Sequence, residues 1–348
     1  MAKIFNRAAL EARGVFLPDT KGFIDERALA MDASMAFDAQ PALATAPNAG
    51  IPAFLTNYLD PEIVEVVFAP NKAEQIMGGS KLKGDWTTQT AMFPYAESTG
   101  EVTSYGDYNE VGSARANANW VSRESYLFQT ITQWGALELD RAGEARINWA
   151  QRQNIASTLV LDKFMNTSWF YGVQNLKCYG LLNDPSLPAS IAPNPANSSN
   201  GDTGTTWPDK SALSIFGDIV SLYNQLITQT QGLIERDAKM VLAMSPQSEA
   251  QLTKTNQYNV NVYDQIKKNF PNLRIETAVQ YENATSGNLV QLIAEEIEGL
   301  ETVFGAFNEK LRAHPVIVAA SSWKQKKTSG TWGAIIRRPL AIASMLGV

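Results

Sequence analysis

Apolar residues recur at helical spacing in two long stretches of the chain. Residues 144–171 contain neither glycine nor proline, and Ala156, Val160 and Phe164 follow one another at intervals of four, which places them along one side of a helix. At about 1.5 Å per residue, this helix would span roughly 40 Å and would need an equally long partner surface. A second helix is predicted from a stripe formed by Ile215, Ile219, Leu222 and Leu226.

Residues 82–134 show the period-two pattern of strands. Tyr126, Phe128 and Thr130 alternate with the residues between them, and a threonine-rich region beside Trp86 precedes them. The polar, turn-rich segment 98–109 separates these two strand regions, so we predict a long two-stranded excursion with a loose tip. Because an isolated two-stranded hairpin is only marginally stable in water, the excursion needs the surface of a neighbouring subunit. The predicted subunit contacts at its tip are Ser98, Tyr105, Asp107, Tyr108 and Asn109.

Helices and strands alternate in the second half of the chain, after a proline- and asparagine-rich loop at 183–211. Short buried strands are expected at 239–244 and 289–293, and Ser245 followed by Pro246 predicts a helix start between them. A further helix is expected at 262–270. The last apolar strands are predicted at 314–320 and 331–345. Together these elements predict an α+β or α/β layered domain.

The first 60 residues are predicted to form an arm. Their alanine, proline and small polar residues, concentrated at 38–50, cannot bury enough apolar area to offset the entropy lost on ordering. Asp60 followed by Pro61 then predicts a helix start.

Composition narrows the possible functions. The chain has 348 residues, of which 45% are hydrophobic, and a formal net charge of −6, so a base-specific DNA-binding protein is not expected. Residues 1–10 lack the apolar run of a signal peptide, and no stretch of about 18 uninterrupted apolar residues predicts a membrane span. The only cysteine, Cys178, cannot form an intrachain disulfide, which fits a reducing cytoplasm.

The chain contains few candidate catalytic or metal-binding residues. Cys178 and His314 are its only cysteine and histidine. No charged cluster near Cys178 indicates activation, so we expect a buried inert thiol. His314 directly precedes Pro315 at the start of an apolar strand, so we expect a structural role for it. This composition cannot easily supply the three or four ligands of a zinc site, and no cofactor motif is present. We therefore predict no enzymatic activity, no catalytic residues, no metal and no cofactor. An enzyme that uses only carboxylates stays open as an alternative.

The densest basic cluster contains Lys324, Lys326 and Lys327, beside Trp323. It could contact nucleic acid, or it could form a solvated loop between two strands. The second interpretation is favoured, because such short charge runs are usually solvated.

Six sequence runs carry a resemblance to one family. The chain resembles the major capsid proteins of tailed bacteriophages that have the Hong Kong 97-type fold, within a subfamily first described as a domain of unknown function. The resemblance covers about residues 49–348. The runs are Ala49–Pro61, Gly84–Thr88, Glu97–Tyr108, Gln129–Gly135, Tyr179–Pro185 and Gly330–Pro339.

This resemblance implies a full domain layout and a function. An N-terminal arm (1–60) and a short helical segment (61–81) would precede an extended β loop (82–134) that lies over an adjacent subunit. A peripheral domain (135–179 and 306–348) would contain the spine helix, and an axial domain (180–305) would surround the capsomer axis. The protein would assemble in the host bacterial cytoplasm into hexamers and pentamers of an icosahedral head that encloses double-stranded DNA.

The resemblance also implies assembly partners, and other classes of structural protein remain as alternatives. A separate scaffolding protein, a portal and possible decoration proteins are expected, and DNA would be contacted without sequence specificity. The lysine and asparagine that crosslink subunits in some relatives cannot be mapped onto this chain. An encapsulin-like shell around protein cargo is the main alternative, followed by a phage tail or adhesin-type structural protein.

Overall fold

The computed structural model describes residues 70–110, 112–144, 148–282 and 287–348. The chain divides into a unit Met1–Ile63 and a unit Val64–Val348, and the described residues all belong to the second. The expected arm, and the helix start expected at Asp60 and Pro61, therefore lie outside the described residues.

A five-stranded sheet occupies one part of this unit. Its strands are β1 (Ser80–Leu82), β4 (Tyr126–Gly135), β10 (Val303–Ala313), β11 (Ile317–Val318) and β12 (Ser322–Ile336). The order is β1-β10-β12-β11, with β4 also paired to β12. Only the β1–β10 pairing is parallel. The long strand β12 is thus the common partner of β4, β10 and β11.

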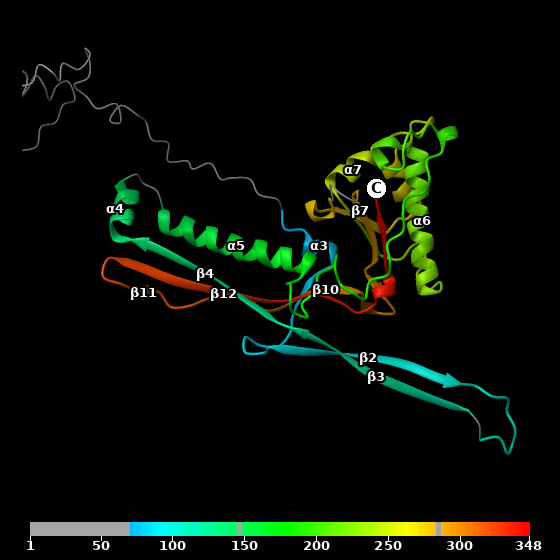
Figure 1. Cartoon of the computed structure of the whole chain (residues 1–348), viewed down its shortest axis with the longest axis horizontal. Helices are drawn as coiled ribbons and strands as arrows, with labels where there is room; N and C mark the ends of the chain where they lie inside the picture. The colour runs from blue at the N-terminus through cyan, green and yellow to red at the C-terminus, as the bar shows by residue number, and fades with distance from the viewer. Residues whose placement is uncertain (1–69, 111, 145–147, 283–286) are drawn as a thin grey trace, which may run out of the picture. The chain divides into compact units, whose positions relative to one another are not determined.

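The helix α5 (Trp149–Tyr171) lies along β4 and β12 (Figure 1). Its start is capped by Asn148, whose side chain accepts a hydrogen bond from the Gln151 amide. Its end is Gly172, where φ is +66° and an added Cβ would collide with the Cys178 carbonyl oxygen. The predicted long helix is confirmed, although it begins later than expected, because residues Ala136–Glu144 form a separate helix, α4.

A four-stranded sheet forms a second layer in the order β13-β7-β5-β6. These strands are β5 (Met240–Met244), β6 (Leu273–Thr277), β7 (Leu289–Ala294) and β13 (Ile342–Leu346). One face packs against α6 (Ala212–Thr230) and α8 (Val262–Asn269) in a large apolar core. The helix predicted from the stripe Ile215 to Leu226, and the elements predicted at 239–244, 262–270 and 289–293, are therefore confirmed.

The opposite face of this sheet joins the two layers. Val241 and Ala243 of β5 share one apolar cluster with Trp169 and Phe170 of α5 and with Ile336 of β12. Both faces of β5 are buried, which explains its uninterrupted apolar sequence. The remaining short elements are α3 (Ala73–Ile76), α7 (Pro246–Gln251), β8 (Glu296–Ile297), β9 (Leu300–Glu301) and four 3₁₀ turns, at Ser198–Asn200, Trp207–Asp209, Val279–Tyr281 and Pro339–Ala341.

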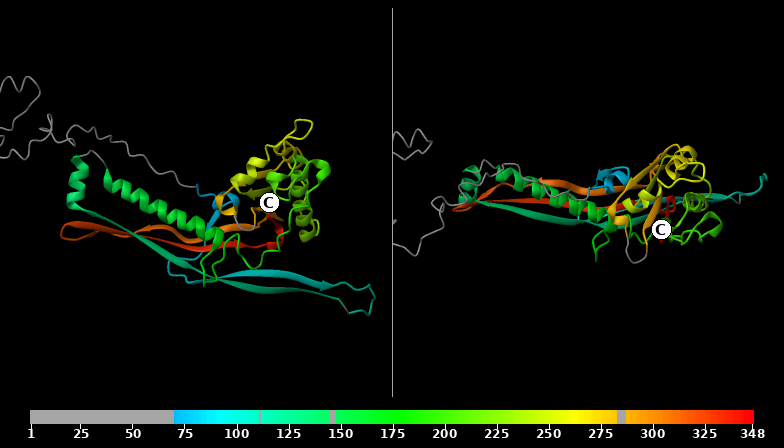
Figure 2. Two further views of the ribbon diagram at one scale, coloured as in Figure 1. Left: turned by 45° about the horizontal axis from the view of Figure 1, so that its top comes forward. Right: turned by 90° about the horizontal axis from the view of Figure 1, so that it is seen from above.

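The strands β2 (Thr90–Glu101) and β3 (Ser113–Glu124) form a separate two-stranded ribbon. They pair along their whole length, from Thr90 with Glu124 to Glu101 with Ser113, and Figure 2 shows this ribbon from two further directions. The predicted two-stranded excursion is present, but its second strand was wrongly placed. The alternating residues 126–131 belong to β4 and pair with β12.

The C-terminal strands also differ from the expectation. The apolar stretch 331–345 is not one strand, because β12 ends at Ile336 and a 3₁₀ turn separates it from β13. The expected strand at 314–320 is reduced to the two residues of β11. Strand β13 pairs with β7, so the end of the chain lies in the same sheet as β5 and not with residues 306–336.

Candidate subunit-contact surfaces

The ribbon presents large side chains that the other described residues leave uncovered. Tyr108 is 100% exposed, Tyr105 is 93% exposed, and Val102 beside them is similarly open. Trp120 on β3 is 58% exposed. Large apolar groups gathered on one exposed element are typical of protein contact sites, so the ribbon is the first candidate surface for subunit contact.

Hydrogen bonds within the ribbon tip give it a defined shape. The Tyr105 hydroxyl donates to Asp107 Oδ1 at 2.9 Å. Asn109 donates from its amide to the Gly106 carbonyl oxygen at 2.9 Å, and from Nδ2 to the Ser104 carbonyl oxygen at 2.8 Å. Asp107 and Asn109 therefore shape the turn, which leaves the tyrosine rings as its most prominent groups.

The fifth predicted contact residue, Ser98, lies away from the tip. It belongs to β2, where its backbone is paired with Ala116 of β3. The structure thus brings four of the five predicted residues together and separates the fifth. That all five contact a neighbour stays a prediction.

The base of the ribbon is fixed by a buried ion pair. Arg123 Nη2 lies 2.6 Å from Asp184 Oδ2, and both side chains are almost fully buried. Asp184 Oδ1 accepts hydrogen bonds from the amide and hydroxyl of Ser186, and the Arg123 guanidinium lies 4.7 Å from the centre of the Tyr179 ring. Such fully bonded charge pairs are geometrically specific. Sequence reasoning missed this pair, because Arg123 and Asp184 are 61 residues apart and no motif links them.

The core also supports the base of the ribbon. Ala91 and Phe93 of β2 pack against a small cluster that contains Phe304 and Trp332. Trp332 in turn donates a hydrogen bond from Nε1 to the Lys83 carbonyl oxygen at 2.8 Å. The ribbon is therefore anchored at one end and free of described core contacts at the other.

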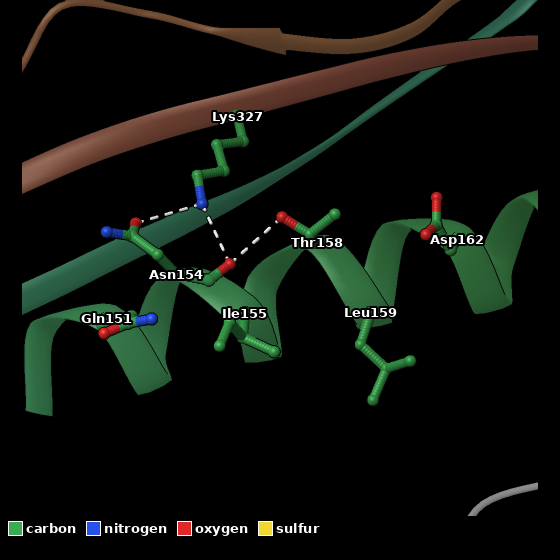
Figure 3. Close-up of a pocket in the computed structure, with 7 residues that line it drawn as sticks. All are labelled: Gln151, Asn154, Ile155, Thr158, Leu159, Asp162 and Lys327. Atoms are coloured by element: carbon green, nitrogen blue, oxygen red, sulfur yellow. Dashed lines mark hydrogen bonds between the residues drawn. The ribbon is translucent and has the colours of Figure 1, made fainter. Parts of the chain in front are cut away.

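Lys327 is buried against α5, as the close-up in Figure 3 shows. Its ammonium group donates to the carbonyl oxygen and Oδ1 of Asn154, at 3.1 and 3.0 Å, and to Ser157 Oγ at 2.7 Å. Burial lowers the pKa of this lysine. The Lys327 ammonium group is thus directed at the helix, and a contact of this basic cluster with DNA stays a prediction.

Lys324 and Lys326 point to the other side of the same sheet. Strand alternation separates them from Lys327, and both are exposed. Lys326 pairs across the ladder with Ile131, and Lys324 pairs with Gln133 on β4 and with Ile317 on β11. We call this surface the open sheet face and define it by Ile131, Gln133, Ile317, Lys324 and Lys326.

The outer side of α5 is a further exposed apolar surface. Ile155 and Leu159 line a shallow hollow of about 620 Å³ together with Gln151, Thr158 and Asp162 (Figure 3). Phe164, on an adjacent line of the helix, instead packs against Phe128 of β4 with ring centres 4.5 Å apart. The helix therefore packs one side against the sheet, and no described residue covers the side that carries Ile155 and Leu159.

The two residues considered for catalysis have structural surroundings. Cys178 is buried, and burial raises the pKa of its thiol to about 11. His314 Nε2 lies 3.1 Å from Thr328 Oγ1, and its ring meets Trp86 edge-on. Within the described residues, no three His, Cys, Asp or Glu side chains are grouped so that they could hold a metal ion, and no described helix is both long and apolar enough to cross a membrane.

A long helix against a β-sheet, a separate α/β layer and an extended two-stranded ribbon define a Hong Kong 97-type capsid fold. Solved capsids share it. The capsid of Myoviridae phage XM1 matches with a TM-score of 0.71 at 16% identity, over 87% of this chain and 100% of that one. The capsid of a native GTA particle matches with a TM-score of 0.60 at 8% identity, over 87% and 99% of the two chains. The Gordonia phage Cozz chain matches with a TM-score of 0.54 at 10% identity, over 88% and 96%.

A family model gives the more specific assignment. The model of the Pa193 gp26 major capsid protein matches residues 42–347, and the chain therefore belongs to this family of phage major capsid proteins. No curated protein matches the sequence. The resemblance found in the sequence is confirmed, and the family is one of structural capsid proteins.

Proposed function

We propose that this protein assembles into hexamers and pentamers that build the icosahedral head of a tailed bacteriophage around its double-stranded DNA. The supporting observation is the ribbon β2–β3, whose tip carries exposed aromatic side chains and whose strands pair only with each other among the described strands. Such a ribbon gains stability when it rests on a neighbouring subunit. The family assignment favours a phage head over an encapsulin-like shell.

The domain layout follows from the same proposal. Residues 135–179 and 306–336 would form most of the peripheral domain, with α5 as its spine helix, and residues 180–305 would form the axial domain. Strand β13 is paired with β7, which supports moving residues 342–346 to the axial side. The exact boundaries between these parts remain predictions.

The proposed partners complete the assembly. A separate scaffolding protein would guide assembly in the host bacterial cytoplasm, a portal would occupy one vertex, and decoration proteins would bind the finished shell. Packaged DNA would be contacted without base specificity, as the resemblance implies, and only weakly, because the net charge of −6 does not favour tight binding to phosphates. A shell role requires no catalytic residue, metal or cofactor.

Assembly of the purified chain tests the proposal. The protein, alone and together with a scaffolding protein of the same phage, is examined by sedimentation and negative-stain electron microscopy. Closed shells, or separate rings of six and five subunits, are the expected result. A chain that stays monomeric at high concentration in both conditions would contradict the proposal.

A further inference from the structure

Two ion pairs among the described residues have both side chains almost fully buried. One is the pair at the base of the ribbon. The other joins Lys210, just before the start of α6, to Asp218 within α6, and both of these side chains are 0% exposed. Only the second pair can react further, because a guanidinium group stays protonated in proteins, whereas an ammonium group that gives up a proton becomes a nucleophilic amine.

The Lys210 ammonium group is held against the Asp218 carboxylate. Its Nζ lies 2.6 Å from Asp218 Oδ2, which places the nitrogen beside Cγ, the carbon that bears this oxygen. A second hydrogen bond, from Nζ to the Asn194 carbonyl oxygen at 2.7 Å, fixes the direction of approach. Reacting groups held in contact in this way have a very high effective concentration.

Both carboxylate oxygens receive hydrogen bonds that suit addition of a nucleophile to Cγ. Asp218 Oδ1 accepts a hydrogen bond from the backbone amide of Asn194 at 2.9 Å, and Oδ2 accepts one from Trp207 Nε1 at 3.0 Å. Addition to Cγ develops negative charge on Oδ1, at which the Asn194 amide already points, so this donor stabilises the charge. The indole donor lies at the oxygen that would leave.

The pair is surrounded by apolar core. The indole of Trp207, which contacts Asp218, belongs to the large apolar cluster that also contains Ile215 and Ile219 of α6. Two full charges kept away from water carry a large desolvation penalty, and an amide, which is neutral, removes it. The exclusion of water also protects such an amide from hydrolysis.

We propose that Lys210 and Asp218 condense to an amide, an isopeptide bond within the chain. One proton passes from the ammonium group to Oδ2, which leaves an amine and a carboxylic acid. Nζ then adds to Cγ, a second proton moves from Nζ to Oδ2, and the Cγ–Oδ2 bond breaks with release of one water molecule. The Nζ–Cγ bond replaces the Cγ–Oδ2 bond, and no oxidant or other reactant takes part.

The bond would join the end of the loop 183–211 covalently to α6. The chain cannot form an intrachain disulfide, because Cys178 is its only cysteine. An amide between Lys210 and Asp218 would supply a crosslink in the same role. This inference goes beyond the proposed function and does not depend on assembly.

Intact mass spectrometry of the whole chain, purified in its folded form and then denatured, provides the first test. The protein should be lighter than the mass of its sequence by about 18 Da, the mass of one water molecule. Lys210→Arg and Asp218→Ala should each show the full mass of their sequences, whether or not they fold. Asp218→Asn should instead lose about 17 Da, because its side chain releases ammonia when the amide forms.

Trypsin digestion locates the bond and contains its own control. Trypsin cuts after free lysines, so the amide should abolish cleavage after Lys210 and give a single peptide, 178–236, with an internal ring. Lys254 is the matched control, because its ammonium group donates to the carbonyl oxygens of Trp207, Pro208 and Lys210 and to no described carboxylate. Cleavage after Lys254 should be complete in the same digest.

The outcomes separate this inference from the proposed function. A chain of full mass that is cut after Lys210 would show an ion pair only and would overturn the inference, even where particles form. A mass loss that persists in Asp218→Ala would place the change elsewhere and would overturn it as well. A loss of one water molecule that depends on both residues would support the inference, even in a chain that forms no particles and so contradicts the proposed function.

Discussion

The strand β5 and the ribbon β2–β3 are both regular β-structure, yet their side chains have opposite surroundings. Every residue of β5, Met240–Met244, is buried between two apolar clusters of the same chain. Most of β3 is exposed, and its sequence alternates alanine with asparagine, serine and arginine. Backbone pairing alone therefore does not make a strand part of a core. The side chains decide whether a strand is stabilised within its own chain or, as we propose for the ribbon, against a neighbour.

Removing residues 331–348 should have the largest effect on stability, because it removes strands and side chains of the core. Deletion from Thr331 onward removes all of β13 and the buried residues Trp332, Ile335 and Ile336. Burial of each large aliphatic side chain contributes about 1.5–3 kcal/mol, whereas domains are stable by only about 5–15 kcal/mol. The truncated chain should be insoluble and should show no cooperative thermal transition by circular dichroism.

Breaking the ion pair at the base of the ribbon should have the next largest effect. Asp184→Asn leaves the buried Arg123 charge without its partner, and loss of one member of a buried pair costs about 3–5 kcal/mol. The free energy of unfolding in urea measures this loss. Replacing both residues, with Arg123→Met and Asp184→Leu, should recover most of the stability. If the double variant is as unstable as the single one, the pair is not the cause.

Alanine substitutions of one core tryptophan and one ribbon tryptophan compare the two regions directly. Trp332→Ala removes a fully buried side chain and should lower the free energy of unfolding by about 3–5 kcal/mol. Trp120→Ala, at an exposed ribbon position, should change that free energy by less than about 0.5 kcal/mol while reducing the yield of particles. Equal destabilisation by the two substitutions would contradict the distinction between these regions.

The tip tyrosines should affect assembly alone. Replacing Tyr105 and Tyr108 by serine removes two exposed rings, so circular dichroism spectra and melting curves should not change, while fewer particles form. Tyr258→Ser is the control, because Tyr258 is exposed on another part of the chain. Particles of unchanged yield and stability would show that the tip is not a subunit contact.

The smallest expected effect concerns the buried thiol of Cys178, whose protonation and reactivity report on the core. Because burial raises its pKa to about 11, the folded protein keeps the thiol protonated where an unfolded chain, with a thiol pKa of about 8.5, begins to lose the proton. The free energy of unfolding should therefore fall slightly as the pH rises above the pKa of the unfolded chain's thiol. A thiol reagent should modify Cys178 only as fast as the core opens, and rapid modification of the folded protein would contradict its burial.

Local patterns in the sequence predicted local elements well. The stripe from Ile215 to Leu226 and the helix start at Ser245 both correspond to observed helices. The apolar run of β5 could be recognised because both of its faces are buried. These features depend on neighbouring residues, whose spacing the sequence states directly.

Pairing between distant segments could not be predicted in the same way. The alternation at 126–131 indicates a strand but carries no information on its partner, β12, which lies almost 200 residues later. A prediction of residues 322–336 as one strand would have placed Lys327 on the opposite face from Lys324 and Lys326, because side chains alternate along a strand. Their charges instead suggested a solvated loop, since nothing local shows that Asn154 and Ser157 receive the Lys327 ammonium group.

The anchored base of the ribbon makes it a lever. With the Arg123–Asp184 pair as its fulcrum, a strand of twelve residues reaches about 40 Å, so tilting it by about 10° would move the tip by roughly 7 Å. Such a tilt would leave the two larger apolar clusters unchanged, because neither contains a residue of β2 or β3. A ribbon of this length reaches neighbours at different angles after only a small change at its base, which is the mechanical requirement for closing a curved surface from identical parts.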